Sequence, residues 1–498
     1  MKPVVLPSQA REIDREMIEE AKIPGLLLME QAAFAVCSVL EQMELSGRRI
    51  LVVAGGGNNG GDAFAAGRIL LLRGFDVQVG FLSSGKLPAD AAANFAFWEH
   101  SGRLTLLDGQ TALADFFGQP ADAILDGLFG IGLNREPAGL YADIIRAINQ
   151  HPAKKVAIDI PSGVFGETGA APLAVWADET VTFQYAKPGH LLFPGRALTG
   201  RLHIAKIGVD HAQSPLQWVD DFSLPPRPAN THKGSYGRLA IVAGSRGMAG
   251  AALLCTRAGI AGGAGLTTLL SCPSVCEAAQ ISIPTATVLQ DSLSPDFLSA
   301  SRPAAELLAG FQAVAVGPGL GKHSETSRLV QEIAALPLPK VMDADALTLL
   351  SQALPKFGSN TILTPHPKEF SRLSGLPVER ILEYPVACAQ EFSQKHGVVL
   401  LLKGATTVVA DQQRAYLITA GSPGMAKGGS GDALTGVIGA LLAQGLPPAT
   451  AAYGGAYLCG KAGERAAKHR GEYSMTAEDT IAHLWPCQEE MAESCRCH

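Results

Sequence analysis

The protein has 498 residues, too many for a single hydrophobic core of ordinary size, so we expect two domains. Hydrophobic residues make up 47% of the chain and charged residues 17%, which argues against disorder and against a collagen-like repeat. The net charge of −6 comes without a dense lysine and arginine run. We therefore expect small-molecule partners, and neither nucleic acid nor membrane.

The two ends of the chain give further expectations. The start, MKPVVLPSQAREIDREMIEEA, offers no signal-peptide core, and no later apolar run approaches the ~20 residues that span a bilayer, so we expect a cytoplasmic protein. Most of the nine cysteines lie singly in apolar surroundings, as reduced thiols do. The last residues, CQEEMAESCRCH, gather three cysteines and a histidine, either as a soft-metal cluster or as a frayed terminus. The paired CxxC spacing of zinc sites is missing, which favours a flexible tail over 486–498.

A proline-rich break divides the chain. Residues 220–234, DDFSLPPRPANTHKG, interrupt the apolar periodicity, which predicts domains over 1–220 and 221–485. On both sides short Val/Ile/Leu runs alternate with helical stretches, a pattern typical of α/β folds with parallel sheets. Functional residues are then expected where the strands end.

The expected elements follow in chain order. The first half opens with helices over 8–21 and 29–43 and continues with strands over 49–55, 76–82, 123–127, 155–160 and 179–184. The second half has strands over 238–244, 265–271, 313–319, 340–345, 360–365, 398–404 and 406–411.

A glycine loop follows the first strand of the N-terminal half. LVVAGGGNNGGDAFAAGRIL matches GxGxxG at Gly55, Gly57 and Gly60, which by itself is a weak signal. A dinucleotide site also needs an acid at the end of the second strand, whereas Asp76 stands at its start, which argues against an NAD-dependent dehydrogenase. The loop either holds phosphate on its backbone N–H groups or is a tight turn.

Two further strand ends of this half carry acids. Asp126 leads from its strand into the loop GLFGIGLNREP, and Asp159 ends a strand close to Ser162. Any one aspartate could cap a loop or a helix, but successive βα units bring such residues to one crevice. Oxygen donors at Asn59, Asp126 and Ser162 would suit a hard cation.

The segments GGGNNGGDAFAAGRIL, DGLFGIGLNRE and AIDIPSGV resemble the signatures of NAD(P)H-hydrate epimerases, whose Rossmann-like domain interconverts the R and S hydrates. The resemblance implies a potassium ion at Asn59, Asp126 and Ser162. Asp159 is the candidate acid/base. Lys187 is a weaker candidate that could equally be a surface lysine. The resemblance places the hydrate at Asn58, Asn59, Gly60, Gly61, Asp62, Gly130, Ile131, Gly132, Leu133, Asn134, Arg135, Glu136 and Asp159.

The second half carries three candidate residues of its own. His366 stands between two prolines in a rigid loop, which favours a site over a buried core histidine. Lys403 ends a strand and either faces a phosphate or is simply solvated. GGSGD, ending in Asp432, opens an apolar helix, so its N–H groups and helix dipole can hold a phosphoryl group while the carboxylate accepts a hydroxyl proton. A capping role is compatible with the same position.

GGSGD resembles the anion hole and base of the ribokinase-like superfamily, in which the motif is commonly GAGD; Ser430 replaces the alanine. Within that superfamily HKGSYG, AGSRGMAGA, VGPGLG, DADAL, TPHPKEF, LKGATTVV and GGSGDALTG resemble NAD(P)H-hydrate dehydratases over residues 230–445. The resemblance implies that Asp432 is the base and that the S-hydrate lies near Ala251, Gly319, His366 and Asp432. It places a nucleotide at Lys403, Gly404, Ala405, Thr406, Thr407 and Gly431.

Together the resemblances predict a fused repair enzyme built from an N-terminal Rossmann-like and a C-terminal ribokinase-like three-layer sandwich. It would act on NADHX and NADPHX, the hydrates of NADH and NADPH, with ADP favoured over ATP as co-substrate. Mg²⁺ is expected at the phosphates, and we expect a homo-oligomer. The alternatives are a ribokinase-like vitamin or sugar kinase and a first half that serves only as a binding or scaffolding domain.

Overall fold

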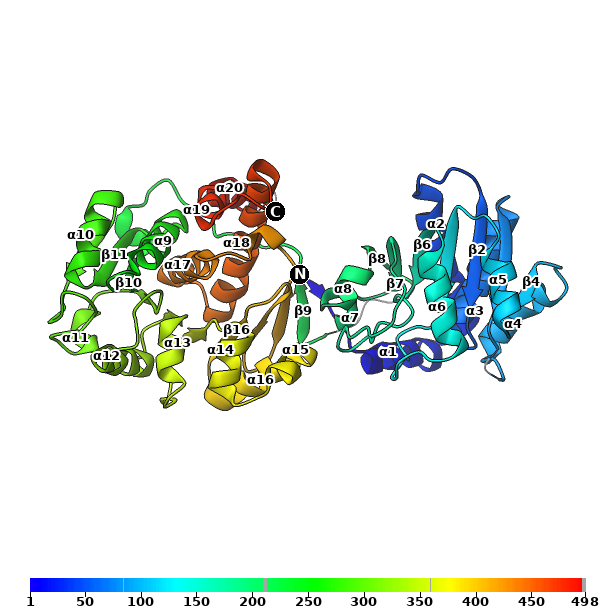
Figure 1. Cartoon of the computed structure of the whole chain (residues 1–498), viewed down its shortest axis with the longest axis horizontal. Coiled ribbons are helices and arrows are strands. Elements are labelled where there is room, and N and C mark those ends of the chain that lie inside the picture. The colour runs from blue at the N-terminus through cyan, green and yellow to red at the C-terminus, as the bar shows by residue number, and fades with distance from the viewer. Residues whose placement is uncertain (84, 209–212, 359, 495–498) are drawn as a thin grey trace. The chain divides into compact units, whose positions relative to one another are not determined.

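The computed structural model describes residues 1–83, 85–208, 213–358 and 360–494 (Figure 1). The chain forms two compact units, an N-terminal unit of Pro3–Ser214 and a C-terminal unit of Met1–Lys2 with Pro215–His498. The predicted division at residue 220 therefore lies a few residues inside the C-terminal unit, just after its strand β9 (Leu216–Val219). Both units are α/β, as the sequence predicts.

The N-terminal unit is built on a parallel sheet of seven strands in the order β4-β3-β2-β5-β6-β7-β8. One face packs on α2, α3 and α4, and the other on α5 and α6, which gives three layers. The chain reverses direction across the sheet between β2 and β5, where open α/β sheets form their crevice. The strands are β2 (Arg49–Ala54), β3 (Asp76–Phe81), β4 (Leu104–Leu106), β5 (Ala123–Gly127), β6 (Lys154–Ile158), β7 (Glu179–Phe183) and β8 (Arg201–Ala205); the helices are α1 (Pro7–Glu19), α2 (Gly25–Gln42), α3 (Asn58–Leu72), α4 (Ala89–Glu99), α5 (Gln110–Phe117), α6 (Leu140–Gln150), α7 (Pro188–Leu191) and α8 (Gly195–Leu198).

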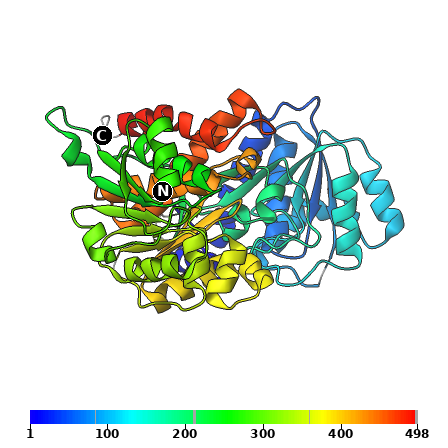
Figure 2. The same cartoon turned by 60° about the vertical axis from the view of Figure 1, so that its left-hand side comes forward.

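The C-terminal unit has an eleven-stranded sheet in the order β1-β9-β18-β17-β16-β15-β14-β13-β10-β11-β12. From β16 to β12 the neighbours are parallel, whereas β17 is antiparallel to both β16 and β18. Figure 2 shows these strands between two helix layers, with α9, α17 and α18 on one face. The strands are β1 (Lys2–Pro3), β9, β10 (Arg238–Val242), β11 (Leu266–Ser271), β12 (Thr287–Gln290), β13 (Ala313–Val316), β14 (Lys340–Met342), β15 (Thr361–Leu363), β16 (Val399–Leu402), β17 (Thr407–Ala410) and β18 (Ala415–Ile418); the helices are α9 (Ala249–Ala261), α10 (Pro273–Ser282), α11 (Ala304–Leu307), α12 (Ser324–Ala335), α13 (Asp345–Leu350), α14 (Pro367–Ser374), α15 (Val378–Glu383), α16 (Pro385–His396), α17 (Ser430–Ala443), α18 (Pro448–Arg470), α19 (Ala477–Ala482) and α20 (Leu484–Ser494).

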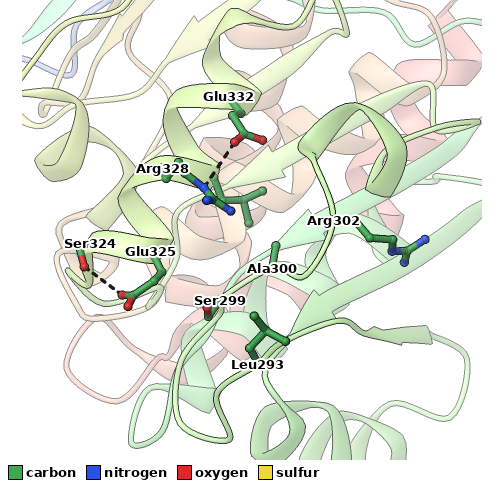
Figure 3. A pocket seen from close by; sticks show the side chains of 9 residues that line it. Leu293, Ser299, Ala300, Arg302, Ser324, Glu325, Arg328 and Glu332 are labelled. Atoms are coloured by element: carbon green, nitrogen blue, oxygen red, sulfur yellow. Dashed lines mark hydrogen bonds and ion pairs between the residues drawn. The ribbon is translucent and has the colours of Figure 1, made fainter.

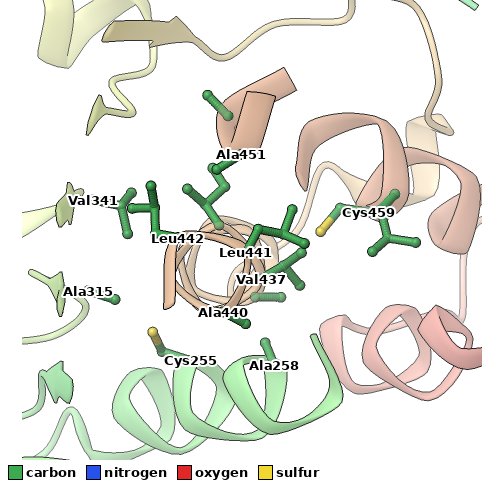
Figure 4. Packing of buried hydrophobic residues seen from close by; sticks show 14 of the residues in the cluster. Cys255, Ala258, Ala315, Val341, Val437, Ala440, Leu441, Leu442, Ala451 and Cys459 are labelled. Carbon is green, nitrogen blue, oxygen red and sulfur yellow. The ribbon is translucent and has the colours of Figure 1, made fainter. Parts of the chain in front are cut away.

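Helix α17, which begins in the predicted GGSGD motif, lies at the centre of the C-terminal core (Figure 4). Its side chains are buried nearly all round, so residues 433 and 435–443 face protein on every side. A Cβ added to Gly436 would lie 2.2 Å from the carbonyl oxygen of Cys255 on α9. Glycine at this position therefore allows the two helix backbones to touch, and fixes where the N-terminus of α17 points.

The end of the C-terminal unit differs from the predicted tail. Helix α20 covers the first part of residues 486–498, and Cys487 and Met491 are buried in the core around α17. The prediction of a flexible tail is thus wrong as far as residue 494, because apolar side chains on one face of α20 pack onto the unit. Cys495, Cys497 and His498 lie outside the described residues. No helix in the described part of the chain is long and apolar enough to cross a membrane.

We expect Gly436→Ala to lower the free energy of unfolding by about 2–3 kcal/mol, because the added methyl forces α9 and α17 apart. Gly250→Ala, also in a helix but with open space around the new Cβ, is the matched control and should cost nothing or stabilise slightly. Urea unfolding of the two variants checks the difference. Equal stability of both would show that the helix contact is not tight.

Candidate active sites

The glycine loop of the N-terminal unit joins β2 to α3 and is folded tightly against the end of β5. A Cβ on Gly55 would lie 2.0 Å from the carbonyl oxygen of Leu128, and one on Gly60 would lie 1.9 Å from that of Gly55. These two glycines are therefore required by close backbone packing, as the tight-turn interpretation predicts. A Cβ on Gly57 would meet nothing within 4 Å, so this loop position is open.

The three predicted cation ligands do come together, around the backbone of Phe129. Asn59 donates its side-chain N–H to the Phe129 carbonyl (2.8 Å), and the Phe129 N–H donates to Ser162 Oγ (2.8 Å). Ser162 in turn donates its hydroxyl to Asp126 Oδ1 at 2.6 Å. The site thus combines amide, hydroxyl, carbonyl and carboxylate oxygens, a donor set that fits a hard cation. The Phe129 carbonyl was missed, because a backbone oxygen has no signature in the sequence.

The negative charge of Asp126 favours the binding of a cation by this oxygen cluster. The side chain is fully buried, and burial raises its pKa to about 6, although hydrogen bonds from Ser162 and the Leu128 N–H oppose the rise. Near neutral pH the carboxylate is therefore largely ionised in a site without a lysine or arginine partner among its described contacts. A cation would supply the missing charge.

Asp159 is held by a buried lysine. Its Oδ1 pairs with Lys187 Nζ at 2.8 Å and accepts a hydrogen bond from the Thr182 hydroxyl at 3.0 Å. Lys187 is 2% exposed, so the surface-lysine alternative is wrong. Burial acts to raise the pKa of Asp159, but the charge and hydrogen bond of Lys187 outweigh it, and the net pKa is lowered. Asp159 is therefore ionised at neutral pH.

His190 fixes the backbone of this acid. Burial and the charge of Lys187 lower the pKa of His190 to about 4, so the ring is neutral. Its Nδ1 accepts the Lys187 N–H (3.0 Å), which leaves Nε2 to donate to the Asp159 carbonyl (2.8 Å). Asp159 has φ +64°, a strained conformation for a residue with a Cβ. Nothing in the sequence pattern singles out His190, because its role depends on contacts with Lys187 and with Asp159, 31 residues earlier in the chain.

A cavity of about 160 Å³, open to solvent, lies beside Asp159 and Lys187. Asn58, Asp62, Ile131 and Asp159 of the predicted substrate residues line it, together with Lys187. Burial raises the pKa of Asp62 well above its usual range, and repulsion from Asp159 adds to the rise. Their surroundings thus shift the pKa values of the two carboxyl groups in opposite directions, which is the division needed for acid and base roles.

The other predicted substrate residues lie outside the lining of this cavity. Gly60 and Gly61 pack inside the unit, and Gly130 lies against Asn59, while residues 132–136 form a half-buried to exposed loop. Asp14 of α1 does line the cavity and was missed. Helix α1 carries several acids, so nothing in its pattern distinguishes Asp14.

The C-terminal unit has a second lysine–aspartate pair, directly beneath the N-terminus of α17. Lys403 Nζ lies 2.7 Å from Asp343 Oδ1, and Thr435 donates its hydroxyl to Asp343 Oδ2 at 2.9 Å. A Cβ on Gly431 would lie 3.3 Å from Asp343 Oδ2 and 3.4 Å from Lys403 Nζ. The sequence-predicted Lys403 and Gly431 are thus brought together. Asp343 was missed as a site residue, although it stands at the end of β14 in the DADAL motif.

Asp432 is half-buried in the first turn of α17. Burial raises its pKa to about 7, the neighbouring carboxylates Asp343 and Asp345 add to the rise, and Lys403 opposes it. The first N–H groups of a helix have no intrahelical acceptor, and intrahelical bonding here begins at Ala433, which donates to Gly429 (3.0 Å). The arrangement combines an anion-binding helix end with a carboxylate poised to take a proton near neutral pH.

Of the remaining predicted residues of this unit, Ala251 lies in the first turn of α9, whereas Gly319 and His366 lie just after strands β13 and β15. A Cβ on Gly319 would lie 3.1 Å from Ala251 Cβ, so these two are in contact. His366 caps α14, accepting the N–H groups of Lys368 (3.2 Å) and Glu369 (3.3 Å), and its side chain is 46% exposed. The buried-core alternative for His366 is therefore wrong. Residues 404–406, at the turn between β16 and β17, and Thr407 at the start of β17 continue the chain from Lys403.

A further pocket of about 310 Å³ lies beside α12 in the C-terminal unit (Figure 3). Both of its arginines are paired: Arg328 with Glu332 of the same wall (3.6 Å), and Arg302 with Asp291, which is not among the lining residues (2.6 Å). None of the residues described as lining it belongs to the predicted sites. It does not contribute to the two sites above.

Two α/β units with buried carboxylates at glycine-lined strand ends define a two-domain enzyme acting on small molecules. Residues 25–189 match the family described as YjeF-related protein N-terminus, and residues 239–485 match the NAD(P)H-hydrate dehydratase family. The bifunctional NAD(P)H-hydrate repair enzyme of Moorella thermoacetica is 38% identical over 97% of this chain and 96% of its own length. That of Escherichia coli is 36% identical over 97% of this chain and 94% of its own.

The chain therefore belongs to the family of bifunctional NAD(P)H-hydrate repair enzymes. Among solved structures, the ADP/ATP-dependent NAD(P)H-hydrate dehydratase of Bacillus subtilis, co-crystallised with ATP and Mg²⁺, is 29% identical with a TM-score of 0.48. That likeness covers 54% of this chain and 95% of the other.

We expect Lys187→Met to lower the free energy of unfolding by about 3–5 kcal/mol at pH 7, because it leaves Asp159 buried without its counter-ion. In the native protein the pKa of Asp159 is lowered, so its ionised form stabilises the fold at pH values above the pKa that it has in the unfolded chain. This stabilisation is lost as the pH falls through the pKa of the folded state. The dependence of stability on pH has the opposite sign in the variant, whose free energy of unfolding should increase as the pH falls from 7 towards 5. Urea unfolding across this range checks both.

Lys187→Met/Asp159→Asn is the control for this prediction, because it removes the buried charge together with its partner. We expect it to recover most of the lost stability. A single variant as stable as the native protein would contradict the role given to the pair.

Proposed function

We propose that the N-terminal unit epimerises the R and S hydrates of NADH and NADPH, and that the C-terminal unit converts the S-hydrate back to NAD(P)H with ADP as phosphoryl donor. The observation that carries this proposal is the lysine-paired carboxylate beneath each glycine-lined strand end, in a chain related over nearly its full length to repair enzymes.

The epimerase step is proposed for the cavity of Asp62, Asp159 and Lys187. Epimerisation at C6 of the hydrated ring requires proton transfer to and from its hydroxyl. Asp159, kept ionised by Lys187, suits the base, and Asp62, with its raised pKa, suits the proton donor. The hydrate would be oriented by Asn58, Asp62 and Ile131, which line the cavity, and by the adjoining loop 130–136.

A potassium ion is proposed at Asn59, Asp126 and Ser162, and the Phe129 carbonyl completes the oxygen set. Potassium favours several neutral oxygens with a single carboxylate, which is the composition of this cluster. Bound there, the cation would balance Asp126 and fix the loop 128–136 beside the substrate cavity.

The dehydratase step is proposed for Asp432. Its carboxylate would accept the proton of the C6 hydroxyl as the hydroxyl oxygen attacks the terminal phosphorus of ADP, and AMP would leave. The phosphate ester would then break its C–O bond as the proton at C5 departs, which restores the dihydronicotinamide ring and releases phosphate. Gly431 and residues 403–407 would hold the nucleotide, and Ala251, Gly319 and His366 would border the hydrate.

Three further features of the proposal concern Mg²⁺, the location of the protein in the cell and its oligomeric state. Oxygen donors around Asp343 suit a Mg²⁺ ion at the ADP phosphates. Seven described cysteines are free and buried, which supports a reducing, cytoplasmic location. Leu26, Leu27 and Phe34 of α2 are exposed, which supports the expected homo-oligomer.

We expect Asp432→Asn to abolish ADP-dependent recovery of dihydronicotinamide absorbance from mixed hydrates with Mg²⁺, a loss of at least 10³-fold, while R and S hydrates still equilibrate. Asp159→Asn should do the reverse: the S-hydrate is repaired and the R-hydrate persists. Chromatography of the epimers with absorbance at the dihydronicotinamide band separates the two. A stable phosphorylated product would instead support the kinase alternative, and no epimerisation by the native chain would support the scaffold alternative.

We expect kcat/KM for dehydration to rise about tenfold from pH 6 to pH 8, because the pKa of Asp432 near 7 sets the fraction of ionised base. Initial rates at low S-hydrate concentration, corrected for hydrate decay without enzyme, measure this limb. A rate independent of pH over this range would argue against Asp432 as the base.

A further inference from the structure

Asp343 is the buried carboxylate closest to the place where the nucleotide phosphates would bind. It is 1% exposed, and both oxygens are engaged, Oδ1 with Lys403 (2.7 Å) and Oδ2 with the Thr435 hydroxyl (2.9 Å). The Cβ position of Gly431 is within 3.4 Å of both members of the ion pair. An anion held at the N-terminus of α17 would therefore lie next to this carboxylate.

The charges around Lys403 are unbalanced. Asp343, Asp345 and Asp432 interact electrostatically in the same site, and Glu369 interacts with both Lys403 and Asp343. One lysine thus faces four carboxyl groups before any phosphate arrives. Because ADP adds further negative charge, Lys403 cannot neutralise both Asp343 and the phosphates, and a second cation is needed.

We propose that Lys403 exchanges partners during nucleotide binding, leaving Asp343 for the ADP phosphate, and that Asp343 then holds the Mg²⁺ ion bound to that nucleotide. This inference rests on the proposed function of the C-terminal unit. Lysine is a point charge on a flexible stem, which suits such a movement. Asp343 Oδ2 and Thr435 Oγ provide oxygens of the kind that Mg²⁺ accepts alongside phosphate. Asp343 is in this account a ligand of the metal, and Lys403 a nucleotide-binding residue.

The exchange predicts opposite effects of one substitution with and without Mg²⁺. In Asp343→Asn, Lys403 is released from its partner, so ADP should bind about tenfold more tightly in EDTA than it binds to the native chain. With Mg²⁺ the native chain should gain at least tenfold in affinity, whereas Asp343→Asn should gain less than twofold. Isothermal titration of the full chain with ADP measures all four affinities, and it requires no turnover. Glu383→Gln, an exposed charge on α15 of the same unit, is the control for net charge.

A second pair of variants separates folding from binding. Lys403→Met leaves Asp343 buried without its partner and should lower the melting temperature, while Lys403→Met/Asp343→Asn should restore it. ADP affinity in EDTA should stay at least tenfold weaker than native in both, because the phosphate has lost its lysine.

Unchanged or weaker ADP binding by Asp343→Asn in EDTA, in a variant with native melting temperature, would overturn the exchange. Retention of the full Mg²⁺ gain by that variant would overturn the assignment of Asp343 to the metal. Failure of the native chain to bind ADP even with Mg²⁺ would instead overturn the proposed function on which the inference rests.

Discussion

The contact between α9 and α17 is the constraint on which the dehydratase site depends. Because Gly436 lets the two backbones touch, α17 is buried on nearly every side and has little freedom to shift. Its N-terminus, with Gly431 and Asp432, is thereby held against the end of β14, where Asp343 and Lys403 meet. If α17 lay on the surface, the position of the motif at its N-terminus would depend on a mobile loop.

Both units place an aspartate at a strand end and hold it with a lysine, but the two pairs differ in exposure. Lys187 is buried and also bonds Thr182 and the Phe183 carbonyl, so its pair with Asp159 is a fixed element of the fold. The side chain of Lys403 is 23% exposed and has Asp343 as its described ion-pair partner. The first pair suits a permanent electrostatic role, and the second suits one that changes when an anion binds.

The sequence predicted the α/β class, the two units and most strands, because periodicity and glycine loops are local signals. It also predicted that Asn59, Asp126 and Ser162 converge, since parallel strands end at one edge. It did not find Asp343, Asp14 or the Phe129 carbonyl. The role of each depends on a neighbour distant in the chain or on the backbone alone. The predicted tail failed for a similar reason, because the burial of Cys487 and Met491 depends on a surface that only the folded unit provides.

The two sites would select different cations for a common reason. Around Asp343 the carboxyl groups outnumber the one lysine that faces them, and Asp126 has no lysine among its described contacts. Each site therefore needs added positive charge to offset its buried carboxylate. Around Asp126 the other donors are neutral amide, hydroxyl and carbonyl oxygens, which suits a large monovalent ion. Around Asp343 further carboxylates gather and phosphates would join them, which suits a small divalent ion with water in its remaining positions. In the function proposed above, the identity of each cation would thus follow from how many neighbouring oxygens are charged.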